Sequence, residues 1–189
     1  MMKSTLILTL SFLCTFPIMA QDFCSEVECQ YLDNLYQVSD SLYRSEQPSR
    51  KGFGELDKLG IKTVLNFRRL WKDDRKARDT DMELVWMPLR AGELTEGELL
   101  AALTAIKNAE KPVLIHCWHG SDRTGAISAA YRIVFEDWSK AHAIEELRIE
   151  ALGYHEDWYP NVIDLINDLD TQSFRTALDI KTSELAAGQ

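Results

Sequence analysis

The chain has 189 residues, of which 46% are hydrophobic and 27% charged, and its formal net charge is −9. This balance is typical of one folded domain with a buried core, and it excludes an extensively disordered chain. The acidic net charge argues against a nucleic-acid partner, because proteins that bind nucleic acid usually present a basic surface.

The first twenty residues are expected to lie outside the fold. They carry Lys3, then an apolar run over residues 5–16, and they end on Ala20. This is the pattern of a secretory signal peptide, and Pro17 disfavours a stable membrane span. We therefore predict a signal peptide over residues 1–20 and a periplasmic or secreted mature protein.

An N-terminal segment, residues 21–34, contains a pair of cysteines. Cys24 and Cys29 lie five positions apart, and in an oxidising compartment such a pair can form a disulfide that holds a loose chain end. Two unrelated thiols are the alternative. The predicted Cys24–Cys29 disulfide would leave Cys117 unpaired, and an unpaired thiol in an exported protein calls for a chemical role.

Residues 35–178 are predicted to form an α/β domain with a small, mostly parallel central sheet flanked by helices. Its elements are a hairpin within 35–49, strands at 61–67, 83–89 and 113–116, and helices at 52–60, 96–110, 124–138, 139–152 and 159–170. Thr95 and Glu98 form a capping box at the start of the second helix. We expect a loop or marginal helix over 68–81 and a weak tail over 179–189.

The segment "HCWHGSDRTG", residues 116–125, joins the last predicted strand to a helix. A glycine-bearing turn before a helix N-terminus directs backbone N–H groups at an anion, and the helix dipole adds to this field. Arg123 could grip two phosphate oxygens with its planar fork. Cys117 lies at the base of this cradle, where the positive field favours a nucleophilic thiolate. Thr124 would place a hydroxyl near the sulfur.

A zinc site is the alternative for this cluster, because His116, Cys117 and His119 are all zinc-ligand types. However, neighbouring strand residues point to opposite faces, so His116 and Cys117 cannot easily share one ion. The other histidines, His142 and His155, are isolated in the sequence. We therefore predict no metal, and we expect His116 to shape the loop beneath the cysteine.

The pattern His-Cys, five residues, Arg and Thr resembles the signature of the cysteine-dependent protein tyrosine and dual-specificity phosphatases. Residues 42–49 and 59–68 also resemble the bacterial, exported branch of this superfamily, and the likeness spans roughly residues 40–160. It implies a small phosphatase fold, a cysteinyl-phosphate intermediate and no cofactor. It also implies a nucleophile, a phosphate clamp and a turnover hydroxyl at Cys117, Arg123 and Thr124. The implied phosphate loop consists of Trp118, His119, Gly120, Ser121, Asp122 and Arg123.

One role of the family does not transfer cleanly. Its members usually carry an aspartate general acid after the strand that corresponds to 85–89, but here that loop reads "RAGELTE". Glu93 could act as the acid, or it could be an ordinary solvated carboxylate. Asp122 is a second candidate, although its charge would repel a bound dianion unless it points away or is neutralised.

Arg68 and Arg90 could extend a substrate pocket, because each follows a strand end at the expected carboxyl edge of the sheet. Such side chains are more often solvated surface charges. The expected function is hydrolysis of phosphotyrosine or mixed phosphoprotein substrates. Inositol phosphates, pyrophosphates or polyphosphates are the alternative, because a phosphate leaving group needs no acid. A phosphate-binding pseudophosphatase is the non-enzyme alternative.

Overall fold

The computed structural model of this protein describes residues 22–180. The predicted signal peptide lies outside the described residues, and so does most of the predicted C-terminal tail. Within the described part of the chain, every helix is too short or too polar to cross a membrane.

Six strands form one sheet in the spatial order β1-β2-β3-β6-β4-β5. The strands β3, β6, β4 and β5 run parallel to one another, while β1 and β2 form an antiparallel edge. The predicted mostly parallel sheet is therefore confirmed. The strand bounds are β1 Ser25–Glu26, β2 Tyr36–Ser39, β3 Leu42–Ser45, β4 Thr63–Asn66, β5 Glu83–Trp86 and β6 Val113–His116.

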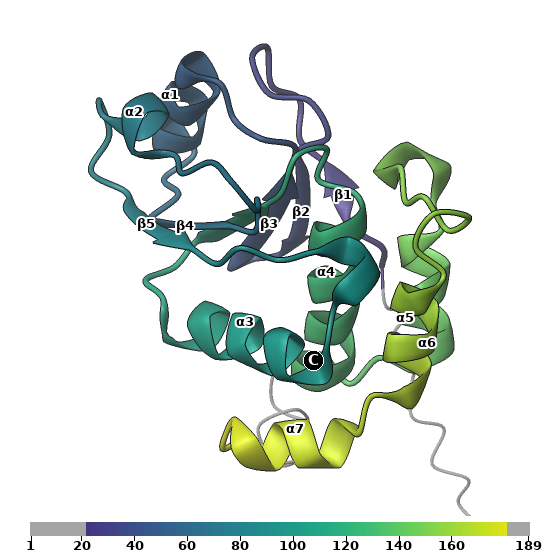
Figure 1. The fold of residues 1–189 in the computed structure, drawn as a ribbon. Coiled ribbons are helices and arrows are strands. Elements are labelled where there is room, and N and C mark those ends of the chain that lie inside the picture. Colours follow the sequence, from purple (N-terminus) through teal and green to yellow (C-terminus); the bar gives the residue numbers. More distant parts are fainter. Residues whose placement is uncertain (1–21, 181–189) are drawn as a thin grey trace, which may run out of the picture.

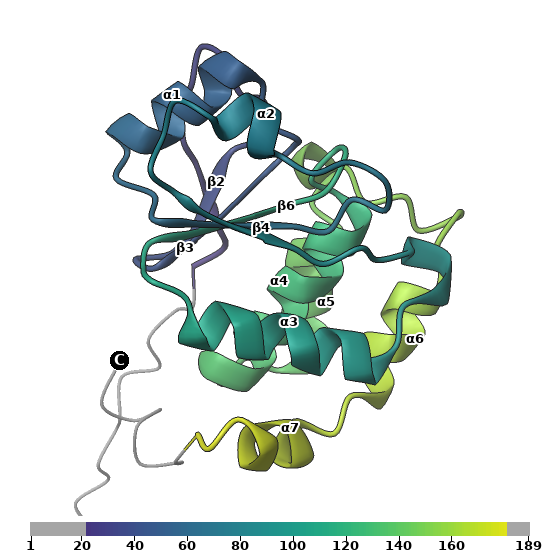
Figure 2. The same ribbon diagram turned by 60° about the vertical axis from the view of Figure 1, so that its left-hand side comes forward.

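Helices cover both faces of this sheet (Figure 1). On one face lie α1 (Arg50–Lys58) and α2 (Asp74–Ala77), and the second of these lies within the segment expected as loop or marginal helix. Figure 2 shows the other helices together on the opposite face. They are α3 (Glu96–Asn108), α4 (Asp122–Phe135), α5 (Lys140–Leu147), α6 (Asn161–Asp168) and α7 (Thr171–Ala177).

The two faces of the central strands bury two separate cores. Leu65 and Ile115 pack into the larger core with the helices α3 to α7, whereas Val64 and Leu114 pack into the smaller core with α1. All four residues of β6 are buried, as expected for a parallel strand that is covered on both sides. This burial fixes β6 in the centre of the sheet, so the segment after His116 leaves from the carboxyl edge.

Local sequence signals set several helix boundaries. The predicted capping box is present at α3, where the Thr95 side chain accepts from the Glu98 N–H and Glu98 accepts from the Thr95 N–H. Gly153 has a φ of +70° after the 3-10 turn Glu150–Leu152, which follows α5. Helix α7 lies inside the predicted domain but beyond the last helix expected from the sequence.

The predicted Cys24–Cys29 disulfide does not agree with the structure, in which both thiols are free. Strand β1 separates the two residues, so Cys24 packs against the larger core and Cys29 against the smaller one. Burial raises the pKa of Cys24 to about 11, and the nearby Glu146 carboxylate adds to this shift. The N-terminal segment is instead held by the Cys24 N–H, which donates to Glu146 Oε1 at 2.7 Å.

A buried ion pair holds this segment against α4 and α5. Arg132 Nη2 and Nε donate to the two carboxylate oxygens of Glu146 at 2.7 and 3.2 Å, and both side chains are at most 5% exposed. Arg132 also contacts Glu136 at 2.6 Å and lies 4.1 Å from the centre of the Trp138 ring. Removing one partner would leave the other charge buried.

We therefore expect Arg132→Ala to lower the free energy of unfolding by about 3 to 5 kcal/mol. The matched control is Arg148→Ala, because Arg148 forms an exposed ion pair with Glu156 at 2.5 Å. That pair should contribute less than about 1 kcal/mol. Urea unfolding followed by circular dichroism measures both values, and equal losses in the two variants would contradict the role given to the buried pair.

Candidate active site

The segment after β6 forms a loop over residues 117–121 before α4 begins at Asp122. Cys117 lies at its start and is 1% exposed, so its thiol is almost entirely covered by the surrounding protein. The loop thus places the side chain of Cys117 beside the N-terminus of a 14-residue helix, which is the arrangement expected for an anion site.

Donors from distant segments hold the carbonyl groups of the loop on its outside. Three consecutive carbonyls are bound in this way: Trp118 O by the Gln47 N–H at 3.0 Å, His119 O by Asn34 Nδ2 at 2.7 Å, and Gly120 O by Arg44 Nη2 at 2.7 Å. Because each carbonyl points outward, the N–H side of the same peptides faces the centre of the loop. Converging N–H groups of this kind bind anions.

Gly120 is required by both conformation and space. Its φ is +76°, in the left-handed region that favours glycine. A Cβ atom at this position would lie 2.4 Å from the Ser45 carbonyl oxygen, inside van der Waals contact. The loop can therefore pack against the end of β3 only with glycine at position 120.

His116 lies behind the cysteine and joins two backbone segments. Its Nδ1 is 3.0 Å from the Cys117 carbonyl oxygen, and its Nε2 is 2.8 Å from Asp73 Oδ2. Both side chains are buried, so this contact is shielded from water. His116 therefore fixes the first peptide of the loop to the segment that precedes α2, which is consistent with its expected loop-shaping position.

Arg123 and Thr124 each carry a buried polar atom that has no hydrogen-bond partner among residues 22–180. Arg123 Nη1 donates to the Phe67 carbonyl at 3.3 Å, while its Nε is buried without a partner among the described residues. The Thr124 hydroxyl is likewise buried and unpartnered within residues 22–180. Buried polar groups are usually hydrogen-bonded, so these two groups suit a bound ligand and the thiol beside it.

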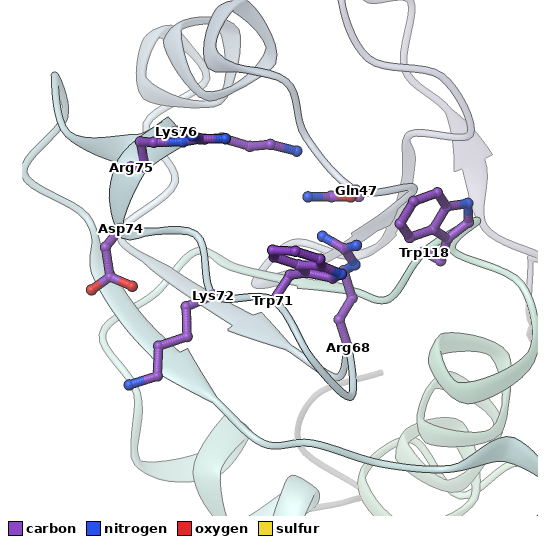
Figure 3. A pocket seen from close by; sticks show the side chains of 8 residues that line it. All are labelled: Gln47, Arg68, Trp71, Lys72, Asp74, Arg75, Lys76 and Trp118. Atoms are coloured by element: carbon purple, nitrogen blue, oxygen red, sulfur yellow. The ribbon is translucent and has the colours of Figure 1, made fainter.

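A pocket of about 310 Å³ opens beside the loop and is lined by Arg68, Arg69, Leu70, Trp71, Trp118 and Arg123. Figure 3 shows Arg68 projecting between Trp71 and Trp118. The guanidinium carbon of Arg68 is 4.4 Å from the centre of the Trp118 ring. Burial lowers the pKa of Arg68, while the nearby Asp73 carboxylate opposes that shift. Because a guanidinium stays protonated in proteins even when burial lowers its pKa, Arg68 is a cation beside the loop.

Arg90, in contrast, does not line this pocket. It forms an ion pair with Glu93, whose two carboxylate oxygens lie 3.0 and 2.8 Å from Arg90 Nη1. Both side chains are more than half exposed. They lie at the turn Ala91–Glu93, which is fixed by a hydrogen bond from the Asn161 side chain to the Ala91 carbonyl. The expectation that Arg90 extends a substrate pocket stays a prediction, since this pocket is lined by other residues. In this conformation Glu93 could act as an acid only after its pairing with Arg90 opens.

Asp122 points away from the centre of the loop toward His155. Asp122 Oδ1 accepts from the His155 N–H at 3.0 Å and lies 3.0 Å from His155 Nδ1. His155 in turn stacks on Trp158, with the ring centres 4.8 Å apart. These contacts meet the condition under which a carboxylate is tolerated in a phosphate loop, since its charge is directed outward.

Several residues of the site were not found from the sequence. Asn34, Arg44 and Gln47 hold the loop from positions at least 70 residues earlier, and Asp73 supports His116 from within a charged stretch. Trp71 lies in that same stretch, and no local pattern marks it as a pocket residue. Within residues 22–180, no three His, Cys, Asp or Glu side chains are grouped closely enough to hold a metal ion.

The close packing of Gly120 generates a direct test. We expect Gly120→Ala to lower kcat/KM by at least about 100-fold, because even a shift of about 1 Å at a reacting group can cost this much. The matched control is Gly60→Ala. Gly60 has a similar φ of +81° but open space around its Cβ position.

Gly60→Ala should therefore cost about 1 kcal/mol of stability from backbone strain and leave kcat/KM within about twofold. Steady-state rates on an aryl phosphate and thermal unfolding of both variants separate the two effects. A Gly120→Ala variant as active as the control would show that the loop tolerates the added methyl group.

Comparison with known proteins agrees with this geometry. A protein of Pseudomonas aeruginosa, the dual specificity protein phosphatase TpbA, is 38% identical over 128 residues, which are 66% of this chain and 57% of the relative. A crystal structure of TpbA with phosphotyrosine covers 86% of this chain and 99% of that one, with a TM-score of 0.76 and 30% identity. An inositol diphosphatase of Arabidopsis thaliana is 25% identical over 77% of this chain and 74% of its own length. Residues 42–157 match the dual specificity phosphatase catalytic domain, and this chain belongs to that family.

Proposed function

We propose that this protein is a cysteine-dependent phosphatase that hydrolyses phosphotyrosine or mixed phosphoprotein substrates. The observation that carries the proposal is the buried Cys117 thiol at the base of a loop whose three consecutive carbonyls, at residues 118–120, are held by donors from distant segments. The likeness to TpbA, whose structure has been solved with phosphotyrosine, supports the same substrate class.

The geometry supports a two-step reaction. Cys117 Sγ attacks the phosphorus atom in line with the leaving oxygen, so that an S–P bond forms as the P–O bond to tyrosine breaks. Arg123 and the loop N–H groups hold the equatorial phosphate oxygens and stabilise the charge on them. A water molecule then attacks phosphorus, and phosphate is released as the S–P bond breaks. The buried Thr124 hydroxyl can donate to the departing sulfur.

We also propose that the protein is exported. The basic start, the apolar run and Ala20 support a signal peptide over residues 1–20 and a periplasmic or secreted location. A mature chain that begins at Gln21, measured by intact mass, is the expected result. An uncleaved chain recovered from the cytoplasm would contradict it.

The chemistry of Cys117 gives the main test. We expect Cys117→Ser to lower kcat on a phosphotyrosine peptide by at least about 1,000-fold, because an alcohol cannot replace the thiolate nucleophile. Activity of the wild-type chain should be unchanged by a metal chelator. A stoichiometric burst of cysteinyl-phosphate with no further turnover would instead indicate a phosphate-binding pseudophosphatase.

Hydrolysis of inositol pyrophosphates or polyphosphates is the second candidate. It is favoured by the pocket around Arg123, whose lining contains no carboxylate among the described residues, since a phosphate leaving group needs no proton donor. The Arabidopsis inositol diphosphatase supports it as well. Rates for a phosphotyrosine peptide, a phosphoserine peptide, an inositol pyrophosphate and pyrophosphate under identical conditions decide between the candidates.

The role of Glu93 can be tested with paired substrates. If Glu93 supplies the proton, Glu93→Gln should slow hydrolysis of an alkyl phosphate by about 100-fold, within the range for general acid catalysis. An activated aryl phosphate, whose leaving group is stable as an anion, should change by less than about threefold. Arg90→Gln is the control, because it breaks the same ion pair but keeps the carboxylate. Equal effects of both substitutions on both substrates would exclude Glu93 as the acid.

A further inference from the structure

Two further pockets adjoin the active-site pocket and extend it toward α2 and the start of α1. The pocket at Arg123 shares Arg68, Trp71 and Trp118 with a second pocket of about 580 Å³, shown in Figure 3. The second pocket shares two residues of α2 with a third, of about 360 Å³. We call this continuous surface the basic groove. The cationic residues that line it are Arg68, Arg69 and Arg123 in the first pocket, Arg68, Lys72, Arg75 and Lys76 in the second, and Arg50, Arg75, Lys76 and Arg78 in the third.

The charge of the groove is opposite to that of the whole chain, which carries −9. Asp74 is the one acidic residue that lines the three hollows within the described chain, and Figure 3 shows it pointing away from Gln47 and Lys76. Among residues 22–180, no carboxylate forms an ion pair with Arg68, Arg75 or Lys76. Arg50 and Arg78, in the third pocket, lie 2.5 and 4.0 Å from the Asp79 carboxylate. Within the described chain, the positive charge of the groove that no carboxylate pairs is therefore concentrated at Arg68, Arg75 and Lys76.

Lys76 shows how closely these cations are placed. Its Nζ donates to the Pro48 carbonyl at 3.2 Å, which holds the ammonium group inside the groove. Burial lowers the pKa of Lys76, and the neighbouring Arg68 and Arg75 lower it further, while the Asp73 and Glu46 carboxylates oppose this shift. An anion bound among these groups would relieve their mutual repulsion.

The groove is also preformed and partly apolar. Asn66 holds the turn after β4, because its side chain donates to the Trp71 carbonyl at 2.8 Å and accepts from the Arg68 N–H at 2.7 Å. The turn presents Leu70 and Trp71 with 66% and 62% of their surface exposed, opposite Trp118 with 52%. Exposed aromatic and aliphatic side chains between cations suit a peptide better than a small, fully charged molecule.

We propose that the basic groove binds acidic side chains that flank the phosphotyrosine of a protein substrate. The phosphate would occupy the loop at Cys117, and aspartate or glutamate residues nearby in the substrate would contact Arg75 and Lys76. This inference rests on the proposed phosphotyrosine phosphatase activity, and it names the sequence class that the enzyme selects.

The test compares two phosphotyrosine peptides of equal length that differ only in glutamate or glutamine at the flanking positions. We expect kcat/KM to be about tenfold higher for the acidic peptide at low salt, as complementary charge raises the association rate. This preference should fall as salt is added, because the groove is open to solvent. In Arg75→Gln/Lys76→Gln the preference should fall to about twofold or less.

The matched control is Lys58→Gln/Lys62→Gln, which removes two exposed cations beyond the amino end of β4. This control should keep the tenfold preference, and thermal unfolding checks that both double variants are folded. Equal rates of the wild-type chain on the two peptides would overturn the inference while leaving the proposed function intact.

Two further outcomes are distinct from that result. Hydrolysis of a small aryl phosphate without hydrolysis of either peptide would overturn both the inference and the protein-phosphatase proposal. If Arg75→Gln/Lys76→Gln slowed inositol pyrophosphate hydrolysis by about tenfold but left the peptide preference unchanged, the groove would serve a polyphosphate instead, and the inference would be wrong.

Discussion

The outward orientation of the phosphate-loop carbonyls is the constraint on which the site depends. If one of these peptides turned over, a carbonyl oxygen would face the bound anion in place of an N–H group. Donors from the chain before α1 prevent this at Trp118, His119 and Gly120. Burying Arg44 costs more free energy than burying the other two donors, because it carries a charge. Burial lowers the pKa of Arg44, and its Nε has no partner among the described residues. The site therefore depends on a fully buried cation beneath the loop.

The parts of the site that are local in the sequence could be predicted, whereas the contacts that orient the loop carbonyls could not. The order strand, glycine turn and helix is local, so Cys117, Arg123 and the parallel sheet could be predicted from spacing and apolar periodicity. The supporting donors could not be, because the contact between Arg44 and Gly120 spans 76 positions and depends on the pairing of β3 with β6. The disulfide was mispredicted for a related reason. A spacing of five residues suggested a closed loop, but β1 extends the chain and directs the two thiols into different cores.

The segment between β4 and β5 connects the surroundings of Cys117 to the proposed basic groove. Asp73 binds His116 behind Cys117, and the next residues form α2 with Arg75 and Lys76. Asn66 and Trp86 fasten the turn on its other side. The sequence predicted only a loop or marginal helix over residues 68–81, because this stretch is strongly charged. In the fold, the buried Asp73 carboxylate fixes this stretch through its contact with His116. The cations of α2, which follow directly, are thereby held beside the loop in a chain whose net charge is negative.

The positions of Glu93 and Asp122, the two candidate general acids, affect which leaving groups the site can accept. The Glu93 carboxylate is paired with Arg90, outside the pocket at Arg123. The Asp122 carboxylate contacts His155 and points away from the centre of the loop. In this conformation neither carboxylate is placed to protonate the leaving oxygen. A tyrosine phenol has a pKa of about 10 and departs as an anion far more readily than a serine alkoxide. If the proposed phosphatase reaction takes place at this loop, the absence of a fixed proton donor among the described residues favours phosphotyrosine over phosphoserine through leaving-group chemistry alone.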